Sequence, residues 1–307
     1  MKESVLITRN LSKHYGKFEA LKSTSIDIKK GEIYGLVGKN GAGKTTLLRM
    51  IAGQTMPTSG EVELFSETTP KGLDDSRKRI GAMIETPSFF PYLTAAENLE
   101  YYRIQRGIPD SDCIKQLLKE VGLSDTKKKK FKSFSLGMKQ RLGLALAMMN
   151  NPDFLVLDEP INGLDPMGIV EIRNLLLKLN QEKNITIIIS SHILTELSSI
   201  ATEYGFIDKG NLIEQISAEE LKEKCKECIE VNVNNAEKVA VLLENKLDCH
   251  EYEILPNNII RIYRFTDKPS KISSLIINNG IELNSMVVKG TSLEDYFVSL
   301  VGGDINA

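Results

Sequence analysis

The stretch "GKNGAGKT", Gly38 to Thr45, decides how the rest of this chain of 307 residues is interpreted. It fits the pattern G-x-x-x-x-G-K-[ST] and stands between the continuous apolar run "EIYGLVG" and the helical pattern "TTLLRMIAG". Glycines let backbone N–H groups curl around phosphates, and a helix N-terminus adds the positive end of its dipole. We therefore predict a phosphate-binding loop between a buried strand and a helix.

The positions of this loop suggest how it would bind a nucleotide. Lys44 has the reach to contact the β- and γ-phosphates, and the Thr45 hydroxyl is a ligand for Mg²⁺. The other positions expected to surround the phosphates are Gly38, Lys39, Asn40, Gly41, Ala42, Gly43 and Thr46. Mg²⁺ is therefore a predicted cofactor, together with the nucleotide itself.

Two acidic residues end a second buried run, "FLVLDEP". Asp158 stands where a carboxylate is costly unless it binds something, and an indirect hold on Mg²⁺ explains it. Glu159 comes next and is positioned to orient or deprotonate the water that attacks the γ-phosphate. We interpret Asp158 as a residue of the metal site, and Glu159 as a catalytic residue together with Lys44.

A histidine ends a third buried run, "IIISSHIL". The carboxyl ends of parallel strands meet at one crevice, so His192 is expected near the same phosphates. A single histidine is often structural, but at this strand end we favour contact with the γ-phosphate or with the attacking water. His192 is therefore the third predicted catalytic residue.

Strand and helix patterns alternate up to about residue 220, which is typical of an α/β fold with a parallel sheet and helices on both faces. At the N-terminus "SVLITRN" and "STSIDIK" alternate apolar and polar residues, and we expect them to be strands of an antiparallel β subdomain. From about Thr94 to Asn150 the pattern is helical and predicts an insert. The predicted fold is a P-loop core with a parallel sheet, to which these two parts are added.

The pattern changes after about Glu220. Strand-like "CIEVNVN" and "IELNSMVVKG" enclose two helical patterns and a hairpin that turns at Pro256-Asn257-Asn258, and "SLEDYFVSLVG" predicts a final helix. The β-α-β-β-α-β order is that of a small ferredoxin-like α+β unit. We therefore predict two domains, residues 1–220 with the insert at about 94–150, and an accessory domain at residues 221–307.

Composition narrows the cellular setting. The chain is 26% charged and 41% hydrophobic with a net charge of −2, so no strong field attracts nucleic acid or anionic lipid. No apolar run approaches the roughly 20 residues that span a bilayer, and charges interrupt the first residues, unlike in a secretory signal. We expect a cytoplasmic protein that does not bind nucleic acid.

The four cysteines allow two interpretations. Cys225 and Cys228 form "CKEC", which together with Cys249 and His250 offers potential metal ligands. No second C-x-x-C completes the usual zinc spacing, and the cytosol keeps thiols reduced. We favour four free, partly buried thiols over a metal site.

The stretch "FSLGMKQR", Phe134–Arg141, suggests a second phosphate-binding element. It aligns with the L-S-G-G-Q signature motif, and with the motifs above it makes the chain closely resemble the ATP-binding subunit of an ABC transporter. The resemblance implies that the nucleotide is ATP and that two subunits face each other head to tail. The signature of one subunit then closes on the ATP of the other, through Ser135 and Gly137. Leu136 and Met138 depart from the motif.

The resemblance extends from about Val5 to Leu221 and implies roles for three further residues. Tyr15 stands where an aromatic residue stacks on adenine, although an exposed tyrosine at a strand end is the other interpretation. Asp165 in "NGLDP" resembles the acid that couples the two ATP sites. Glu85 replaces the glutamine of the family, and its carboxylate is expected to approach Mg²⁺ or the water.

The segment "PSFFPYL", Pro87–Leu93, also has two interpretations. Its aromatic residues either pack locally against the helical insert or line the groove that, in the family, receives a helix of the membrane subunit. We favour the groove, because exposed aromatic patches mark partner sites.

With these departures, the signature motif resembles that of ABC exporters of drugs and antimicrobial peptides, including bacitracin-resistance and lantibiotic-immunity systems. The resemblance implies an ATPase subunit that forms a homodimer through ATP and drives export by a separate integral membrane permease, on the inner face of the cell membrane. The alternative is a soluble, non-transport ABC ATPase acting on nucleic acid or ribosomes. A P-loop kinase or GTPase is a weaker alternative, since it explains neither Ser135 nor His192.

Overall fold

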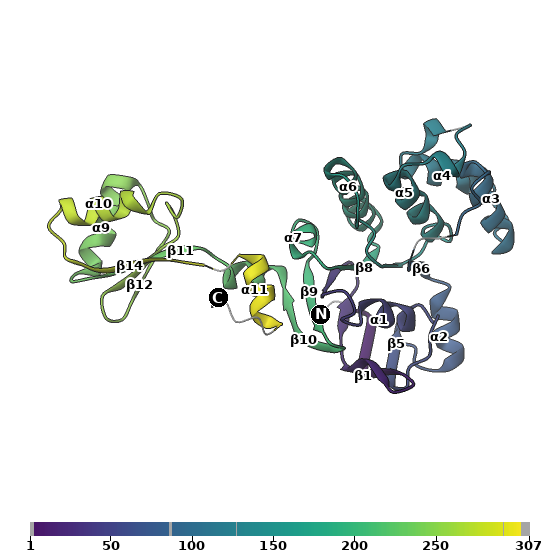
Figure 1. Cartoon of the computed structure of the whole chain (residues 1–307), viewed down its shortest axis with the longest axis horizontal. Helices are drawn as coiled ribbons and strands as arrows, with labels where there is room; N and C mark the ends of the chain where they lie inside the picture. The colour runs from purple at the N-terminus through teal and green to yellow at the C-terminus, as the bar shows by residue number, and fades with distance from the viewer. Residues whose placement is uncertain (1–2, 86–87, 127, 291, 302–307) are drawn as a thin grey trace. The chain divides into compact units, whose positions relative to one another are not determined.

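The computed structural model describes residues 3–85, 88–126, 128–290 and 292–301. The chain forms two compact units, Met1–Ala218 and Glu219–Ala307, each with a hydrophobic core of its own. Figure 1 shows the helices and strands of both units. The division between residues 218 and 219 lies close to the boundary expected from the sequence.

The first unit is built on a six-stranded sheet. Its strands are β4 (Ile33–Val37), β6 (Ile80–Met83), β7 (Phe154–Leu157), β8 (Thr186–Ser191), β9 (Glu203–Asp208) and β10 (Asn211–Ser217). They lie in the order β10-β9-β4-β8-β7-β6, and all neighbours are parallel except β10, which is antiparallel to β9. Every residue of β4, β7 and β8 is buried, which confirms the apolar runs as central strands.

The register of the parallel strands decides where a site can form. Val37 of β4 pairs with Ser191 of β8, and Leu157 of β7 pairs with Ile189 of β8. The residues that follow β4, β7 and β8 therefore leave the sheet at the same edge. At this edge the Gly38 amide donates to the Ser191 carbonyl over 3.2 Å, which ties the loop after β4 to the end of β8.

Helices cover both faces of this sheet, as predicted. They are α1 (Lys44–Ile51), α5 (Leu136–Ala147), α6 (Pro166–Lys183) and α7 (Leu194–Leu197). Figure 1 shows α5, α6 and α7 on one side of the sheet and α1 on the other. The helix α1 shares a core with the N-terminal strands, through residues such as Leu47, Leu48, Leu6 and Leu11.

An antiparallel sheet forms the N-terminal part of the first unit. Its strands are β1 (Ser4–Tyr15), β2 (Phe18–Thr24), β3 (Asp27–Lys29) and β5 (Ser59–Leu64), and β1 pairs with each of the others. The single strand expected over "STSIDIK" is wrong, because the chain breaks between β2 and β3. The Thr8 hydroxyl occupies the break, accepting from the Ile26 amide at 3.0 Å and donating to the Thr24 carbonyl at 3.1 Å.

Short helices connect these sheets to the insert. The helix α2 (Pro70–Arg77) follows β5, and the insert contains α3 (Ala95–Gln105), α4 (Asp112–Glu120) and α5, with 3₁₀ turns at Ser124–Thr126 and Phe131–Ser133. A capping box between Thr94 and Glu97 starts α3. The buried Asn98 side chain accepts from the Phe90 amide at 2.7 Å and donates to the Phe90 carbonyl at 3.2 Å, which shapes the loop before α3.

The second unit confirms the predicted β-α-β-β-α-β order. Its elements are β11 (Cys228–Val233), α9 (Ala236–Leu247), β12 (Tyr252–Leu255), β13 (Ile259–Ile262), α10 (Pro269–Asn278) and β14 (Leu283–Lys289), preceded by α8 (Ala218–Lys224) and followed by α11 (Leu293–Leu300). The strands form one antiparallel sheet in the order β12-β13-β11-β14. Its hairpin turns through Asn257 and Asn258, whose φ angles of 65° and 54° are tolerated by asparagine.

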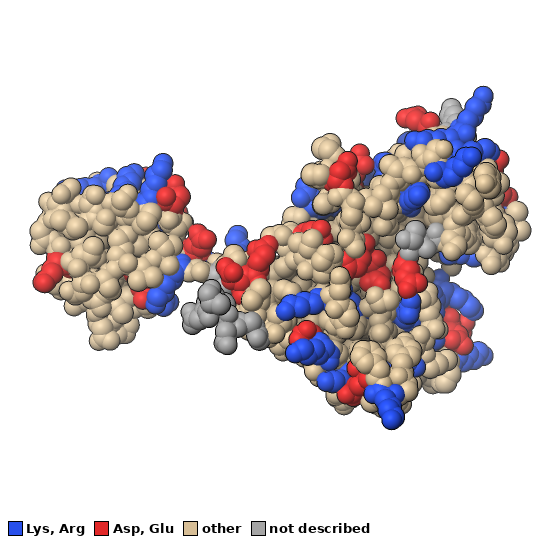
Figure 2. Space-filling model, viewed as in Figure 1, with Lys and Arg blue, Asp and Glu red and all other residues tan. Residues whose placement is uncertain are grey.

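The surface carries both signs of charge. Figure 2 shows basic and acidic residues interspersed on the face in view, in keeping with the net charge of −2. Among the described residues, no helix combines the length and the apolar character needed to cross a membrane.

Candidate nucleotide-binding and active site

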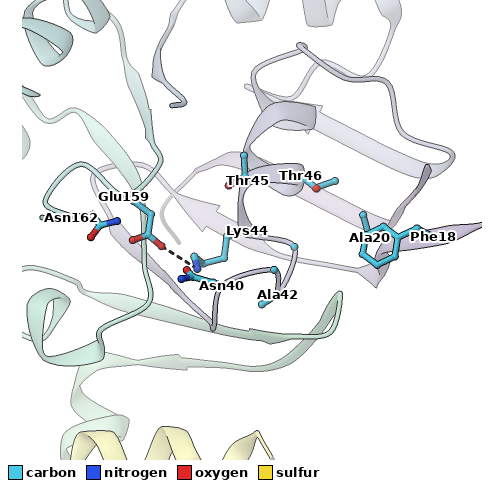
Figure 3. Close-up of a pocket in the computed structure, with 11 residues that line it drawn as sticks. Phe18, Ala20, Asn40, Ala42, Lys44, Thr45, Thr46, Glu159 and Asn162 are labelled. Carbon is cyan, nitrogen blue, oxygen red and sulfur yellow. Dashed lines mark ion pairs between the residues drawn. The ribbon is translucent and has the colours of Figure 1, made fainter. Parts of the chain in front are cut away.

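A cavity of about 320 Å³ lies where β4 leads into α1. Residues 40–46 line it, together with Phe18, Ala20, Glu159 and Asn162 (Figure 3). The predicted phosphate loop and the predicted catalytic acid therefore meet at one cavity, although they lie far apart in the sequence.

Close packing requires two glycines of the loop. A Cβ at Gly38 would lie 2.4 Å from the Ile207 carbonyl oxygen, and a Cβ at Gly43 would lie 2.7 Å from the Ala20 carbonyl oxygen. Gly43 also has a φ of 110°, which side chains disfavour, and it caps α1 without a side chain. The first N–H groups of α1 have no partner within the helix and so remain available to an anion in the cavity.

The Lys44 ammonium is held at the centre of the loop. It donates to the Gly38 carbonyl at 2.6 Å and to the Lys39 carbonyl at 3.3 Å, and it lies 3.1 Å from Glu159 Oε1. Its side chain is only 6% exposed, so these oxygens compensate for much of the lost hydration. Gly38 and Lys39 thus contribute to the site by positioning Lys44.

Three hydroxyl and carboxylate groups meet beside the loop. The Thr45 hydroxyl donates to Asp158 Oδ2 at 2.7 Å, and the Ser190 hydroxyl donates to Asp158 Oδ1 at 2.6 Å. Ser190 Oγ also accepts from the Glu159 amide at 2.9 Å. Hard oxygen donors of this kind suit Mg²⁺, so the residues present fit a magnesium site held by Thr45 and Asp158.

Glu159 also contacts the third predicted catalytic residue. Its Oε2 lies 2.6 Å from His192 Nδ1, while its Oε1 faces Lys44. The residue has a φ of 48°, an uncommon backbone conformation that directs the chain away from β7. The structure therefore brings Lys44, Glu159 and His192 into one chain of contacts at the edge of the sheet. With Glu159 ionised, His192 Nδ1 is the donor and fixes the orientation of the carboxylate.

The residues of the predicted signature lie at a second cavity, of about 340 Å³. Ser135 and Gly137 line it together with Asp165, and it shares no lining residue with the cavity at the phosphate loop. Ser135 caps α5 by accepting from the Met138 amide at 3.3 Å, which leaves its hydroxyl proton free to donate. Within one chain, these residues do not meet the phosphate loop.

The aromatic residue at the phosphate cavity is Phe18, which the sequence interpretation missed. Phe18 is 65% exposed and lines the cavity, whereas Tyr15 pairs with it across the β1–β2 turn and does not line the cavity. Lys13 Nζ lies 5.1 Å from the centre of the Tyr15 ring. The hairpin signal at Gly16 could have drawn attention to Phe18, but which ring lines the cavity depends on the pairing. The role of Tyr15 stays a prediction.

Glu85 contacts helix α1 and does not reach the phosphate cavity. Its carboxylate forms an ion pair with Arg49, it is 67% exposed, and it does not line the phosphate cavity. Its expected role at Mg²⁺ stays a prediction.

The segment before α3 contains both buried and exposed aromatic side chains. Pro87 lies outside the described residues. Phe89 is buried, with ring centres 5.8 Å from Tyr102 and 5.1 Å from Phe131, so it packs locally. Phe90 and Tyr92 are 42% and 71% exposed and leave an aromatic surface beside the insert.

The cysteines are all reduced, and Cys228 and Cys249 are buried. Burial raises the pKa of the Cys225 and Cys228 thiols, which lowers the fraction of reactive thiolate. Within the described ranges, no group of three or more histidine, cysteine and acidic residues is arranged to hold a metal ion.

Comparisons with known proteins identify a family model and several relatives that this chain resembles. A family model described as ABC transporter matches residues 21–162. The bacitracin transport ATP-binding protein BcrA of Bacillus licheniformis is 43% identical over 300 residues, which cover 98% of this chain and 98% of the relative. The lantibiotic transport ATP-binding protein SrtF of Streptococcus pyogenes is 42% identical over 212 residues, 68% of this chain and 89% of the relative.

A solved structure shows the same fold. It is the dimeric, post-hydrolysis state of an ATP-binding cassette with ADP and phosphate bound, 27% identical, with a TM-score of 0.62 over 69% of this chain and 98% of that one. This chain belongs to the family of ABC transporter ATP-binding proteins, and its reaction is the hydrolysis of ATP. The predicted family, fold class and activity are thereby confirmed.

The contacts of Glu159 predict a separation of binding from turnover. Glu159→Gln should keep ATP affinity at or above that of the parent, because it removes an anion that competes with phosphate for Lys44. Turnover should fall by at least about 100-fold, since the acid that accepts a proton from water is lost. ATP affinity and phosphate release are measured on the same preparation. Near-normal phosphate release would refute the assignment.

Ser190 provides a second test, of the metal site. Ser190→Ala leaves Asp158 Oδ1 without its donor, so the Mg²⁺ concentration at half-maximal ATPase rate should rise by about 10- to 100-fold. Ser198→Ala, an exposed serine of the same region, is the control and should leave the Mg²⁺ dependence unchanged. Equal Mg²⁺ curves for both variants would show that Asp158 does not depend on Ser190.

Proposed function

We propose that this chain hydrolyses ATP to drive the export of an antimicrobial peptide antibiotic by a separate integral membrane permease. The observation that carries the proposal is the 43% identity to a bacitracin transport ATP-binding protein along 98% of both chains, which includes the second unit. The similarity to a lantibiotic transport protein points to the same class of substrate. Peptide export fits these relatives better than work on ribosomes or nucleic acid.

Different residues of the site would bind the phosphates and activate the attacking water during hydrolysis. The loop N–H groups and Lys44 bind the phosphates of ATP, while Glu159, oriented by His192, accepts the proton of the attacking water. Thr45 and Asp158 would hold Mg²⁺, which supplies positive charge to the phosphate oxygens. The mechanism thus uses every group of the contact chain at the sheet edge.

The separation of the two cavities supports a head-to-tail homodimer. Ser135 and the N-terminus of α5 offer donors to an anion, yet they share no cavity with the phosphate loop of their own chain. In a homodimer they would close on the γ-phosphate bound by the other subunit. Each ATP would then lie between two chains.

A peripheral position on the inner face of the cell membrane follows from a permease partner. The exposed rings of Phe90 and Tyr92 are suited to receive a helix of that permease, because exposed aromatic side chains mark partner sites. We further propose that residues 221–307 are an accessory domain with a regulatory or dimer-stabilising role. Its core and its sheet are self-contained, and it carries none of the phosphate-site residues.

The dimer can be tested by mixing two inactive chains. Lys44→Ala and Ser135→Ala should each lose most ATPase activity alone. In the mixed dimer, one composite site carries both defects and the other carries none, so activity should return in the mixture. A double variant with both substitutions, mixed with the Lys44→Ala chain, is the control and should show no recovery. Absence of recovery in the first mixture would place Ser135 in its own chain's site.

The substrate class requires an assay in cells. The chain is expressed together with a candidate permease in a bacterium sensitive to bacitracin and to a lantibiotic. The minimal inhibitory concentration of at least one peptide should rise with the wild-type pair and not with Glu159→Gln. An unchanged concentration with an active, co-purifying pair would reject peptide export, and co-sedimentation of the chain with ribosomes would favour the alternative.

A further inference from the structure

Two leucines pack on two glycines where α5 and α6 begin. A Cβ built on Gly163 would lie 3.2 Å from Leu136 Cδ2, and a Cβ built on Gly137 would lie 3.8 Å from Leu164 Cδ2. Each leucine therefore covers the glycine next to the other leucine. We call these four residues, Leu136, Gly137, Gly163 and Leu164, the leucine–glycine lock.

The lock joins two helix N-termini at the second cavity. Leu136 is the first residue of α5, directly after its cap Ser135. Leu164 directly precedes Asp165, which caps α6 by accepting from the Gly168 amide at 2.8 Å. One turn further along, Arg141 of α5 lies 3.4 Å from Glu171 of α6. The two helix starts are thus attached at two successive levels.

The same segment leads back to the catalytic acid. The Asn162 amide donates to the Glu159 carbonyl at 3.2 Å, and the Leu164 amide donates to the Ile161 carbonyl at 3.3 Å. Ile161 is 3% exposed and anchors the segment, while Asn162 lines the cavity at the phosphate loop. A short, hydrogen-bonded stretch of backbone therefore connects the phosphate cavity to the lock at the second cavity.

We propose that Leu136 and Leu164 are positioning residues that tie the Ser135 loop to the segment carrying Glu159. In this arrangement Ser135, whose hydroxyl would contact the ATP of the other subunit, keeps a fixed position relative to Glu159. Glu159 would act on the ATP bound by its own chain. Neither leucine touches the reacting atoms. The inference rests on the proposed homodimer, and it adds a contact within each chain through which the two ATP sites are coupled.

The physical basis is that packed side chains transmit displacement only while they stay in contact. Leu136 is 43% exposed, so its removal deletes this contact without opening a large core cavity. Loss of the lock should leave Ser135 less well held over the other subunit's phosphate. The expected defect therefore lies in dimer closure and in turnover.

The experiment uses full-length chains with Leu136→Ala, Leu164→Ala, both together, and Leu136→Met. The turnover number, KM and the dissociation constant of the ATP-driven dimer are measured, the last in the Glu159→Gln background. Either alanine variant should lower kcat by at least about fivefold and weaken the dimer by a similar factor, with a smaller change in KM. Because the two leucines act as one unit, the double variant should match the single variants within about twofold.

Two controls separate positioning from general damage. Leu136→Met keeps an apolar side chain of similar volume and should restore most of kcat. Ile104→Ala removes an exposed apolar residue of α3 that lines neither cavity, and it should match the wild type. Alanine variants that match Ile104→Ala in kcat and dimer affinity would overturn the proposal, as would losses that multiply in the double variant.

The outcomes also distinguish this inference from the proposed function. A Glu159→Gln chain that stays monomeric in ATP would overturn the homodimer, and the lock would then have no second site to serve. A Glu159→Gln chain that dimerises normally, with Leu136→Ala and Leu164→Ala dimerising equally well and keeping full turnover, would overturn the lock alone.

Discussion

One buried positive charge organises the site. The Lys44 side chain is 6% exposed, and an isolated ammonium at that depth would be strongly destabilising. Two carbonyls of its own loop and the Glu159 carboxylate at 3.1 Å compensate for it. The loop follows β4 and the acid follows β7, so the compensation exists only when both strands lie in one sheet and end at the same edge.

At the same edge of the sheet, Glu159 contacts both Lys44 and His192. One carboxylate oxygen faces Lys44 and the other faces His192. A phosphate that enters the loop must share the ammonium with Glu159, which couples the arrival of the nucleotide to the electrostatics of the acid. Asp158 does not take part in this competition for Lys44, because its two oxygens accept hydrogen bonds from the hydroxyls of Thr45 and Ser190.

Sequence patterns identified the site residues that follow the ends of strands. They missed two site residues that lie inside strands. Lys44 was predicted from the glycine spacing of the loop, and Glu159 and His192 were predicted because each stands at the end of a buried apolar run. Ser190 lies inside the run of β8, where a serine gives no signal of its own, and only the neighbouring end of β7 shows that it reaches Asp158. Phe18 was missed for a related reason, since its place at the cavity depends on the pairing of β1 with β2 and on the fold of α1 against them.

The sequence by itself determined the phosphate loop, the alternating α/β core and the order of elements in the second unit. Local periodicity and glycine spacing are properties of neighbouring residues, and they need no long-range contact to be recognised. Only the tertiary structure decided that Glu85 pairs with Arg49, that Ser135 and the phosphate loop line separate cavities, and that the leucine–glycine lock forms. These features depend on side chains that lie far apart in the sequence, and their contacts arise from the packing of strands and helices against one another.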